Sequence, residues 1–172
     1  RSLILSSARE LGTQIAVQAN KLTEGTGLNV DTIMGGSSIV PQRERLDPKL
    51  VGSSCAYGGA IDILIATPGR LIEHIHTTDG FAARLAGVET LVLDECDMLL
   101  DGGFQRDMEE IFGVLKGERQ TLCFSATVPK KMIAVVSLAL KEDHVVVDCV
   151  GEEKATHAAV TQRAVVHPLG ES

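Results

Sequence analysis

The sequence predicts an α/β fold in which a parallel β-sheet lies between helices on both of its faces, a three-layer arrangement. Short apolar runs alternate with helical patterns along nearly all of the 172 residues, which is typical of strands joined by helices. Most of these runs are apolar at almost every position, as are strands that are buried on both faces. The chain has four Phe, one Tyr and no Trp, so we expect an aliphatic core.

Six apolar runs are expected to form the strands of this sheet. Each is short, and most are rich in Leu, Ile or Val. The second run closes on the pair Gly35-Gly36. The six predicted strands are Ser2–Ser7, Leu28–Met34, Ile61–Thr67, Val88–Asp94, Gln120–Ala126 and His144–Val150.

Helical patterns follow four of these strands. The first has apolar residues at helical spacing, and the second opens with a proline in its first turn, where a missing N–H is tolerated. The four predicted helices are Ala8–Leu22, Pro68–His76, Phe104–Lys116 and a segment that begins near Pro129 and runs to Lys141.

Two stretches lack either pattern. Residues 37–59 are rich in Gly, Ser and Pro and are expected to be partly a surface loop. The polar tail over residues 151–172 suits a linker.

Composition narrows the class of function. The net charge is −7 with no long basic run, which argues against tight non-specific nucleic-acid binding but allows a local phosphate site. The four cysteines are widely spaced and form no CxxC pair, so neither a zinc site nor a disulfide framework is expected, and a reducing compartment is favoured. No apolar stretch reaches the length of a membrane span and no signal peptide is visible. We expect an intracellular protein.

Polar residues gather where the predicted strands end, in the segments "SSARE", "ATPGR", "DECD" and "SAT". Ligands of open α/β sheets bind at the carboxyl ends of the strands. A carboxylate at such a strand end is suited to hold Mg²⁺ beside nucleotide phosphates, so Asp94 would hold the metal through water and Glu95 would polarise the attacking water. The alternative is that Asp94 or Asp97 only caps the following helix.

The other strand ends allow similar pairs of interpretations. Thr67, Gly69 and Arg70 supply a hydroxyl, an amide and a cation for an anion site, or they form an ordinary turn into a helix. Ser125 and Thr127 either hydrogen-bond to the acidic cluster or cap the next helix. Arg9 and the glycine pair are weak signals alone: a solvated helical turn and a plain turn would explain them.

The order of the motifs is more specific than any one of them. "SARELGTQ", "GG", "DILIATPGRL", "LVLDECDMLLDGGF" and "QTLCFSATVP" resemble, in sequence and spacing, the first RecA-like domain of DEAD-box RNA helicases. The resemblance covers nearly the whole chain. The downstream segments "ALKEDHVVV" and "THAAVTQRAVVHPLGES" are similar to a subgroup that includes fungal mitochondrial and plant, partly organellar, members. This similarity implies a mitochondrial or plastid location, or otherwise a nuclear or cytoplasmic one.

The resemblance implies a role for each matching position. The cofactors would be ATP and Mg²⁺, and the partners would be the RNA backbone and a second RecA-like domain of the same protein. Asp94 and Glu95 are similar to the magnesium and water-activating carboxylates, and Asp97, Ser125 and Thr127 to the network that links hydrolysis to RNA distortion. The positions that resemble the family's grip on the sugar-phosphate chain are Arg9, Gly35, Gly36, Thr67, Gly69 and Arg70.

The sequence departs from the family pattern in three ways. Ser7-Ala8 replaces the usual Pro-Thr, so the threonine hydroxyl that would meet a phosphate is missing. The segment between Gly36 and Ile61 is longer than usual. The chain also begins after the part that carries the glutamine motif and the glycine-rich phosphate loop (P-loop) with its lysine, and the second RecA-like domain is absent.

The third departure implies an incomplete domain. We expect a partial N-terminal RecA-like domain over residues 1–150, a linker over residues 151–172, and a fragment that by itself neither binds ATP tightly nor hydrolyses it. The phosphate-loop strand lies inside the family sheet, beside the segment that corresponds to His144–Val150. We therefore expect either a gapped sheet in which Val145–Val147 are poorly paired or closure by a different pairing.

Two other functions are compatible with parts of the sequence. One is a truncated, non-catalytic module that binds RNA or a partner protein. The other is a DNA helicase of a related superfamily, against which the combination of "ATPGR" and "SAT" argues.

Overall fold

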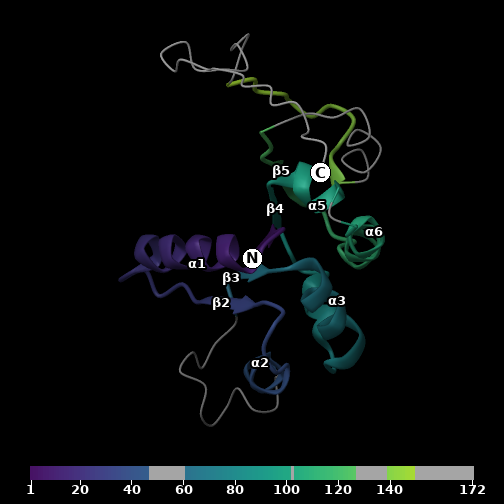
Figure 1. Ribbon diagram of the computed structural model, residues 1–172. Coiled ribbons are helices and arrows are strands. Elements are labelled where there is room, and N and C mark those ends of the chain that lie inside the picture. Colours follow the sequence, from purple (N-terminus) through teal and green to yellow (C-terminus); the bar gives the residue numbers. More distant parts are fainter. Residues whose placement is uncertain (47–60, 102, 127–138, 150–172) are drawn as a thin grey trace, which may run out of the picture. The chain divides into compact units, whose positions relative to one another are not determined.

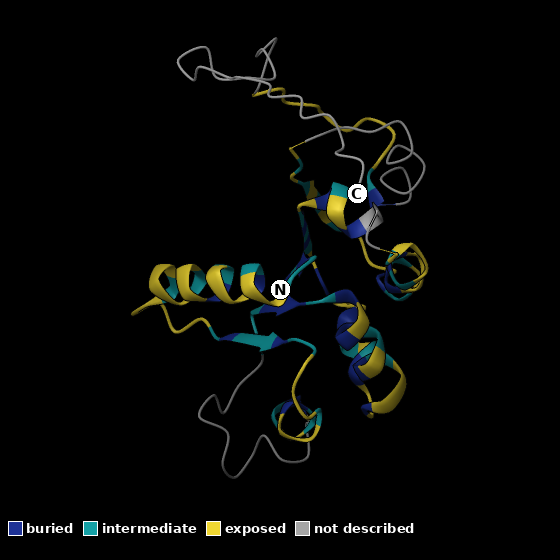
Figure 2. Cartoon of the chain, in the orientation of Figure 1, coloured by how far each residue is buried: buried dark blue, intermediate teal, exposed yellow. Residues whose placement is uncertain are grey.

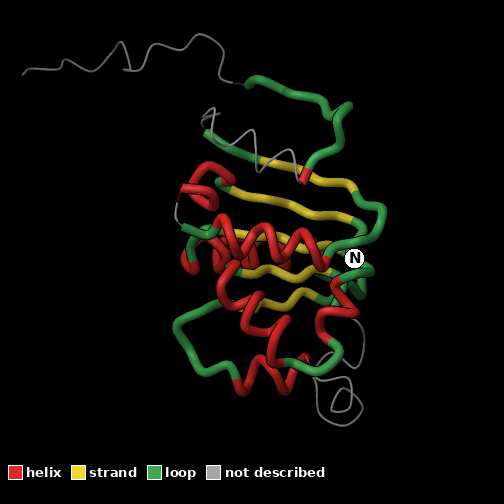
Figure 3. The backbone as a smooth tube through the Cα atoms, turned by 90° about the vertical axis from the view of Figure 1, so that its right-hand side faces the viewer, coloured by secondary structure: helices red, strands yellow, loops and turns green. Residues whose placement is uncertain are grey.

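The computed structural model describes residues 1–46, 61–101, 103–126 and 139–149. At its centre is a five-stranded sheet in the order β2-β3-β1-β4-β5, whose strands lie side by side in Figure 3. Every pairing is parallel, which confirms the predicted class. The strands are β1 (Ser2–Ser6), β2 (Val30–Ile33), β3 (Ile63–Ala66), β4 (Thr90–Asp94) and β5 (Gln120–Cys123).

Helices cover both faces of the sheet, as expected. In Figure 1, α1 lies to one side of the strands, and α3 and α6 lie to the other. Buried residues form two separate clusters that match these two sides. The helices of the described residues are α1 (Arg9–Thr23), α2 (Val40–Leu46), α3 (Pro68–Thr77), α4 (Phe81–Leu85), α5 (Cys96–Asp101) and α6 (Gln105–Val114).

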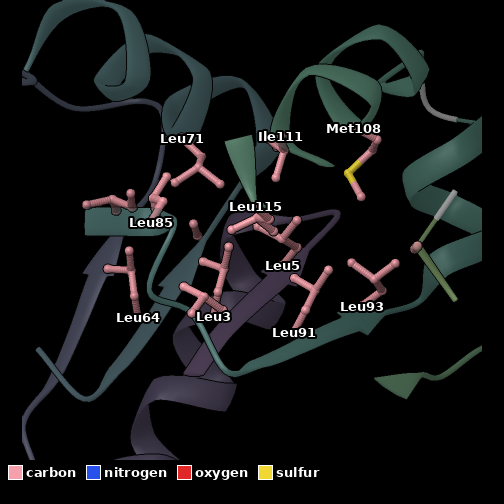
Figure 4. Packing of buried hydrophobic residues seen from close by; sticks show 14 of the residues in the cluster. Leu3, Leu5, Leu64, Leu71, Leu85, Leu91, Leu93, Met108, Ile111 and Leu115 are labelled. Atoms are coloured by element: carbon pink, nitrogen blue, oxygen red, sulfur yellow. The ribbon is translucent and has the colours of Figure 1, made fainter. Parts of the chain in front are cut away.

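The larger core lies between the sheet and the helices α3, α4 and α6. Leu3 and Leu5 of β1 face it together with Leu91 and Leu93 of β4, because alternate residues of a strand share a face. Each of these four leucines is at most 3% exposed, and burying each contributes about 1.5–3 kcal/mol. Figure 4 shows side chains of the same cluster from α3, α4 and α6, which are Leu71, Leu85, Met108 and Ile111, and Leu115, which directly follows α6.

The smaller core lies on the opposite face, under α1. Ile65 and Val30 pack there against Ala16 of the helix. The helix comes close to the sheet at Gly12, where an added Cβ would lie 2.8 Å from Cε of Met34. The outer face of α1 is exposed (Figure 2).

The predicted sixth strand is wrong. The described residues of that segment, His144–Cys149, form no strand. Val145, Val146 and Val147 are 85%, 75% and 77% exposed, which agrees with the expectation that they are poorly paired. The preference of valine for strands is realised only where a neighbouring strand accepts its backbone and side chains.

Three short helices were not predicted. The helix α2 forms within the segment expected to be partly loop, and α4 and α5 follow α3 and β4. The helix predicted from Pro129 to Lys141 falls mostly outside the described residues, as does the tail over residues 151–172. The chain divides into two compact units, Arg1–Glu142 and Asp143–Ser172, and the site lies within the first. Among the described residues, no helix has the length and apolar character needed to cross a membrane.

Candidate functional site

The motif residues lie along one edge of the sheet. Because all strands are parallel, their carboxyl ends share this edge, and Gly35, Thr67, Ser7 and Asp94 follow or end β2, β3, β1 and β4 in that spatial order. Ser125 follows β5, next along. The registers Ile33↔Ala66, Ser6↔Asp94 and Leu93↔Cys123 keep these ends level. Thr127, predicted as part of the same site, lies outside the described residues.

Three residues near the end of β4, which we call the carboxylate corner, are Asp94, Glu95 and Asp97. Glu95 has φ = 49°, the only positive φ of a non-glycine residue in the described ranges, and this turns the chain sharply from strand into α5. The backbone N–H of Glu95 donates to Asp94 Oδ1 at 3.1 Å. The hydroxyl of Ser7, at the end of β1, donates to Glu95 Oε2 at 3.1 Å. The turn thus presents the Glu95 carboxylate beside Asp94 and toward β1.

The donor set of the carboxylate corner suits Mg²⁺ bound together with phosphates. No group of three or more His, Cys, Asp or Glu residues in the described part of the chain forms a metal cage. Mg²⁺ is usually held by one or two carboxylates, with waters and substrate phosphates completing its octahedron. Asp94 and Glu95 offer carboxylates of this kind, and Glu95 is exposed while Asp94 is partly buried.

Two thiols meet behind the carboxylate corner, a contact that the sequence did not predict. Cys96 is 1% exposed, and its backbone N–H donates to the Phe124 carbonyl at 2.9 Å. A hydrogen bond from the Cys123 thiol lowers the pKa of Cys96 to about 7, and the same bond raises the pKa of Cys123. Ser125 also hydrogen-bonds to the Cys96 thiol, so Ser125 lies beside the "DECD" segment, and its predicted hydrogen bond to Asp97 stays a prediction.

The segment Gly35–Ser37, which we call the glycine loop, lies against Arg9. Gly36 has φ = +84°, and a Cβ built there would lie 1.8 Å from Arg9 Nη1. Only glycine therefore allows both the backbone conformation and the close approach of the guanidinium group. The Gly35 N–H donates to the Thr67 hydroxyl at 3.3 Å, which ties the ends of β2 and β3 together.

Arg70 is buried, although the sequence suggested a cation for a phosphate. Its side chain is 8% exposed, and Nη2 donates to the Ser37 carbonyl at 2.6 Å. Nε pairs with Glu73 at 2.9 Å. Pro68 lies in the first turn of α3, and Gly69 is exposed beside it. Arg70 therefore acts within the fold by fixing the glycine loop to α3, and its predicted contact with phosphate stays a prediction.

Gln42 and His74 complete this network, and sequence reasoning missed both. Gln42 lies on α2 and is 8% exposed. His74 is fully buried, with Nε2 3.3 Å from Gln42 Oε1 and Nδ1 2.8 Å from the Thr78 hydroxyl. Burial, and then the positive charge of Arg70, lower the pKa of His74 to about 4, so its ring is neutral near pH 7. A lone glutamine inside an expected loop carries no pattern that would have revealed its role.

Comparison with known proteins gives one consistent family. A family model described as "DEAD/DEAH box helicase" matches residues 1–135. The chain is similar to DEAD-box ATP-dependent RNA helicase 26 of Arabidopsis thaliana, with 41% identity over 169 residues, which is 97% of this chain but 19% of that protein. The chain therefore spans about a fifth of the length of this relative.

Solved structures agree with this match. The yeast DEAD-box splicing factor Prp28 is similar with a TM-score of 0.64 and 32% identity, over 78% of this chain and 29% of that one. Mss116p bound to single-stranded RNA and AMP-PNP is similar with a TM-score of 0.65 and 28% identity, over 80% of this chain and 27% of that one.

Proposed function

The chain belongs to the DEAD/DEAH box helicase family, and from that premise we propose that it is part of an ATP-dependent RNA helicase. The full-length protein would couple ATP binding and hydrolysis to the remodelling of RNA duplexes or RNA–protein complexes. The observation that carries the proposal is that five strand ends bring the carboxylate corner and the glycine loop to one edge of a single sheet.

The half of the edge formed by β1, β2 and β3 is proposed to bind the RNA backbone. The glycine loop with the adjacent Arg9, and the exposed Gly69 in the first turn of α3, present backbone groups and a guanidinium group without any base-reading aromatic side chain. Such contacts are independent of base sequence. The similar Mss116p structure contains single-stranded RNA, which supports this assignment. The proposed RNA-binding residues are Arg9, Gly35, Gly36, Thr67, Gly69 and Arg70.

The half formed by β4 and β5 is proposed to serve ATP hydrolysis. Asp94 would hold Mg²⁺ through water, and Glu95 would accept a proton from the attacking water. Mg²⁺, when bound, neutralises charge on the nucleotide phosphates. The left-handed turn at Glu95 brings its carboxylate to the Ser7 hydroxyl beside the end of β1, and the exposed carboxylate would accept the proton there.

Asp97, Ser125 and Thr127 are proposed to link the two activities. Hydrogen bonds join Cys96, after β4, to Phe124 and Ser125, after β5. A displacement at the end of one strand would therefore move the end of the other. A second RecA-like domain of the same protein would complete the site. An intracellular location, in a mitochondrion or plastid or otherwise in the nucleus or cytoplasm, is also proposed.

The test is RNA-stimulated ATP hydrolysis by the full-length protein. Glu95→Gln removes the proton acceptor but keeps the shape of the side chain, so kcat should fall about 10²- to 10⁴-fold while RNA affinity is kept. Glu109→Gln on α6 changes an exposed carboxylate elsewhere and is the matched control.

Two results would contradict the proposal. RNA binding with no ATP hydrolysis in the wild-type protein would indicate the non-catalytic module. Stimulation by DNA but not by RNA would indicate a DNA helicase.

A further inference from the structure

The glycine loop cannot fix its own position. Gly35 and Gly36 have no side chains, and Gly36 adopts a positive φ that an unanchored glycine leaves easily. Its anchors must come from neighbouring elements. Among the described residues, Thr67 anchors the Gly35 amide, and Arg70 anchors the Ser37 carbonyl.

Gln42 holds both flanks of the loop. Its Nε2 donates to the Met34 carbonyl at 3.0 Å, just before the glycine pair, and to the Ser37 hydroxyl at 3.3 Å, just after it. One side-chain amide thus spans the glycine pair. Gln42 lies on α2, which begins four residues after Gly36, and its side chain is 8% exposed.

The orientation of this amide is set from α3. Gln42 Oε1 accepts from Arg70 Nη1 at 3.0 Å and lies 3.3 Å from His74 Nε2. Arg70 is a donor only, so the amide oxygen must face it, and the amide NH₂ must then face the Met34 carbonyl. The reverse orientation would place donors against donors and an oxygen against an oxygen. Because His74 donates to the same oxygen, its Nδ1 accepts from Thr78.

We propose that Gln42 is a positioning residue for RNA binding, which holds the glycine loop where its backbone meets the ribose-phosphate chain. This inference rests on the proposed function and deepens it: the grip on RNA is set by a buried amide of α2 that touches no nucleotide. Arg70 and His74 are its supports, because they fix the direction in which the amide donates.

Gln42→Glu in the full-length protein is the sharpest test. The carboxylate keeps the size of the side chain and still accepts from Arg70 and His74, but it cannot donate to the Met34 carbonyl. The RNA concentration for half-maximal ATPase stimulation should rise about 5- to 30-fold, as expected for the loss of one or two hydrogen bonds. At saturating RNA, kcat should stay within about twofold, because the bound loop is forced into place.

Two further measurements separate positioning from a general loss of structure. Amide hydrogen exchange at Gly35, Gly36 and Ser37 should be about tenfold faster in Gln42→Glu, while exchange in β1 and β4 is unchanged. The matched control is Gln105→Glu, at an exposed position of α6. It should change neither the RNA concentration for half-maximal stimulation nor the exchange rate of the glycine loop. Gln42→Ala removes all of the contacts and should weaken RNA binding at least as much.

The inference is overturned if the Gln42→Glu variant has the wild-type RNA concentration for half-maximal ATPase stimulation. It is equally overturned if amide exchange in the glycine loop is as slow in this variant as in the wild type. It is also overturned if kcat, RNA affinity and the unfolding midpoint all fall together, since that is the result of a merely structural role. A wild-type protein without RNA-stimulated hydrolysis would refute the proposed function instead, and the exchange measurement would still decide whether Gln42 holds the loop.

Discussion

The edge of the sheet at the carboxyl ends of the strands has two halves, and these halves are built in opposite ways. Around the glycine loop, Gln42, Arg70 and His74 are buried and bonded to one another and to the backbone. At the carboxylate corner, Glu95 is exposed, and its side chain accepts from the Ser7 hydroxyl at 3.1 Å. The chain itself supplies hydrogen-bond partners for the buried side chains of the first half, whereas the second half leaves Glu95 exposed and Asp94 and Asp97 partly exposed.

The difference follows from charge. A polar network can be buried when each donor meets an acceptor, and here the guanidinium group of Arg70 also meets Glu73. Neighbouring carboxylates without a cation would be costly to bury, so they stay near water until a cation neutralises them. Four substitutions or titrations test this contrast.

The largest effect should come from Arg70→Ala. It leaves the Ser37 carbonyl without its buried guanidinium donor and takes one of the two donors from Gln42 Oε1, and we expect a loss of about 2–4 kcal/mol of unfolding free energy in urea denaturation. Asp94→Asn at the other half should change stability by less than about 0.5 kcal/mol, as should the exposed control Arg106→Ala. Equal losses for Arg70→Ala and Asp94→Asn would remove the contrast.

Acidic pH should lower the free energy of unfolding, because the ring of His74 in the buried half is neutral in the folded state. The folded-state pKa of this ring is lowered from 6.5 to about 4, by burial first and by Arg70 second. Between these two pH values the unfolded state binds the proton and the folded state does not, so stability falls as pH drops from about 6.5 toward 4. The loss should be on the order of 2–3 kcal/mol, and His74→Gln should flatten this part of the curve.

Gly36→Ala separates backbone strain from the contact with Arg9. Gly27 has a similar positive φ but nothing within 4 Å of an added Cβ, whereas Gly36 has the Arg9 guanidinium there. Both alanine variants should lose about 1–2 kcal/mol of stability. Only Gly36→Ala should weaken RNA binding in fluorescence anisotropy, by roughly tenfold. Equal RNA affinities of the two variants would mean that the position of Arg9 is unimportant.

The smallest effect concerns the exposed half. Ser7→Ala removes the hydroxyl that donates to Glu95, and kcat of RNA-stimulated hydrolysis should fall about two- to fivefold, the value of one exposed hydrogen bond. Ser7→Thr keeps the hydroxyl and should restore kcat. Thr23→Ala, at the far end of α1, is the control. A hundredfold fall in kcat for Ser7→Ala would show that the half with the carboxylate corner is already ordered before a ligand binds.

Much of the fold could be predicted from the sequence because burial leaves a clear pattern. The five strands of the sheet are short apolar runs, and α1, α3 and α6 have helical spacing. The segment His144–Cys149 has the same composition but no strand, since a strand depends on a neighbour that local sequence does not name. The helix α2 escaped prediction because Pro41 and a run of charged residues hide its short apolar side.

The site was predictable in its positions but less so in its contacts. Parallel strands place their carboxyl ends together, so Asp94, Thr67 and Ser125 could be assigned to one edge. The burial of Arg70 depends on Gln42, which is 28 residues away in the sequence. No local pattern announces such a pairing, and an arginine beside a helix start is compatible with either solvent or core.

The backbone at Glu95 carries a final consequence. A glutamate with φ = 49° costs about 1 kcal/mol relative to a glycine, which adopts this conformation freely. Glycine at this position would therefore make a more stable protein without the carboxylate that we propose as the proton acceptor. Selection for thermostability should accordingly favour glycine here, whereas the proposed hydrolysis requires glutamate, so stability and activity place opposite demands on this one residue.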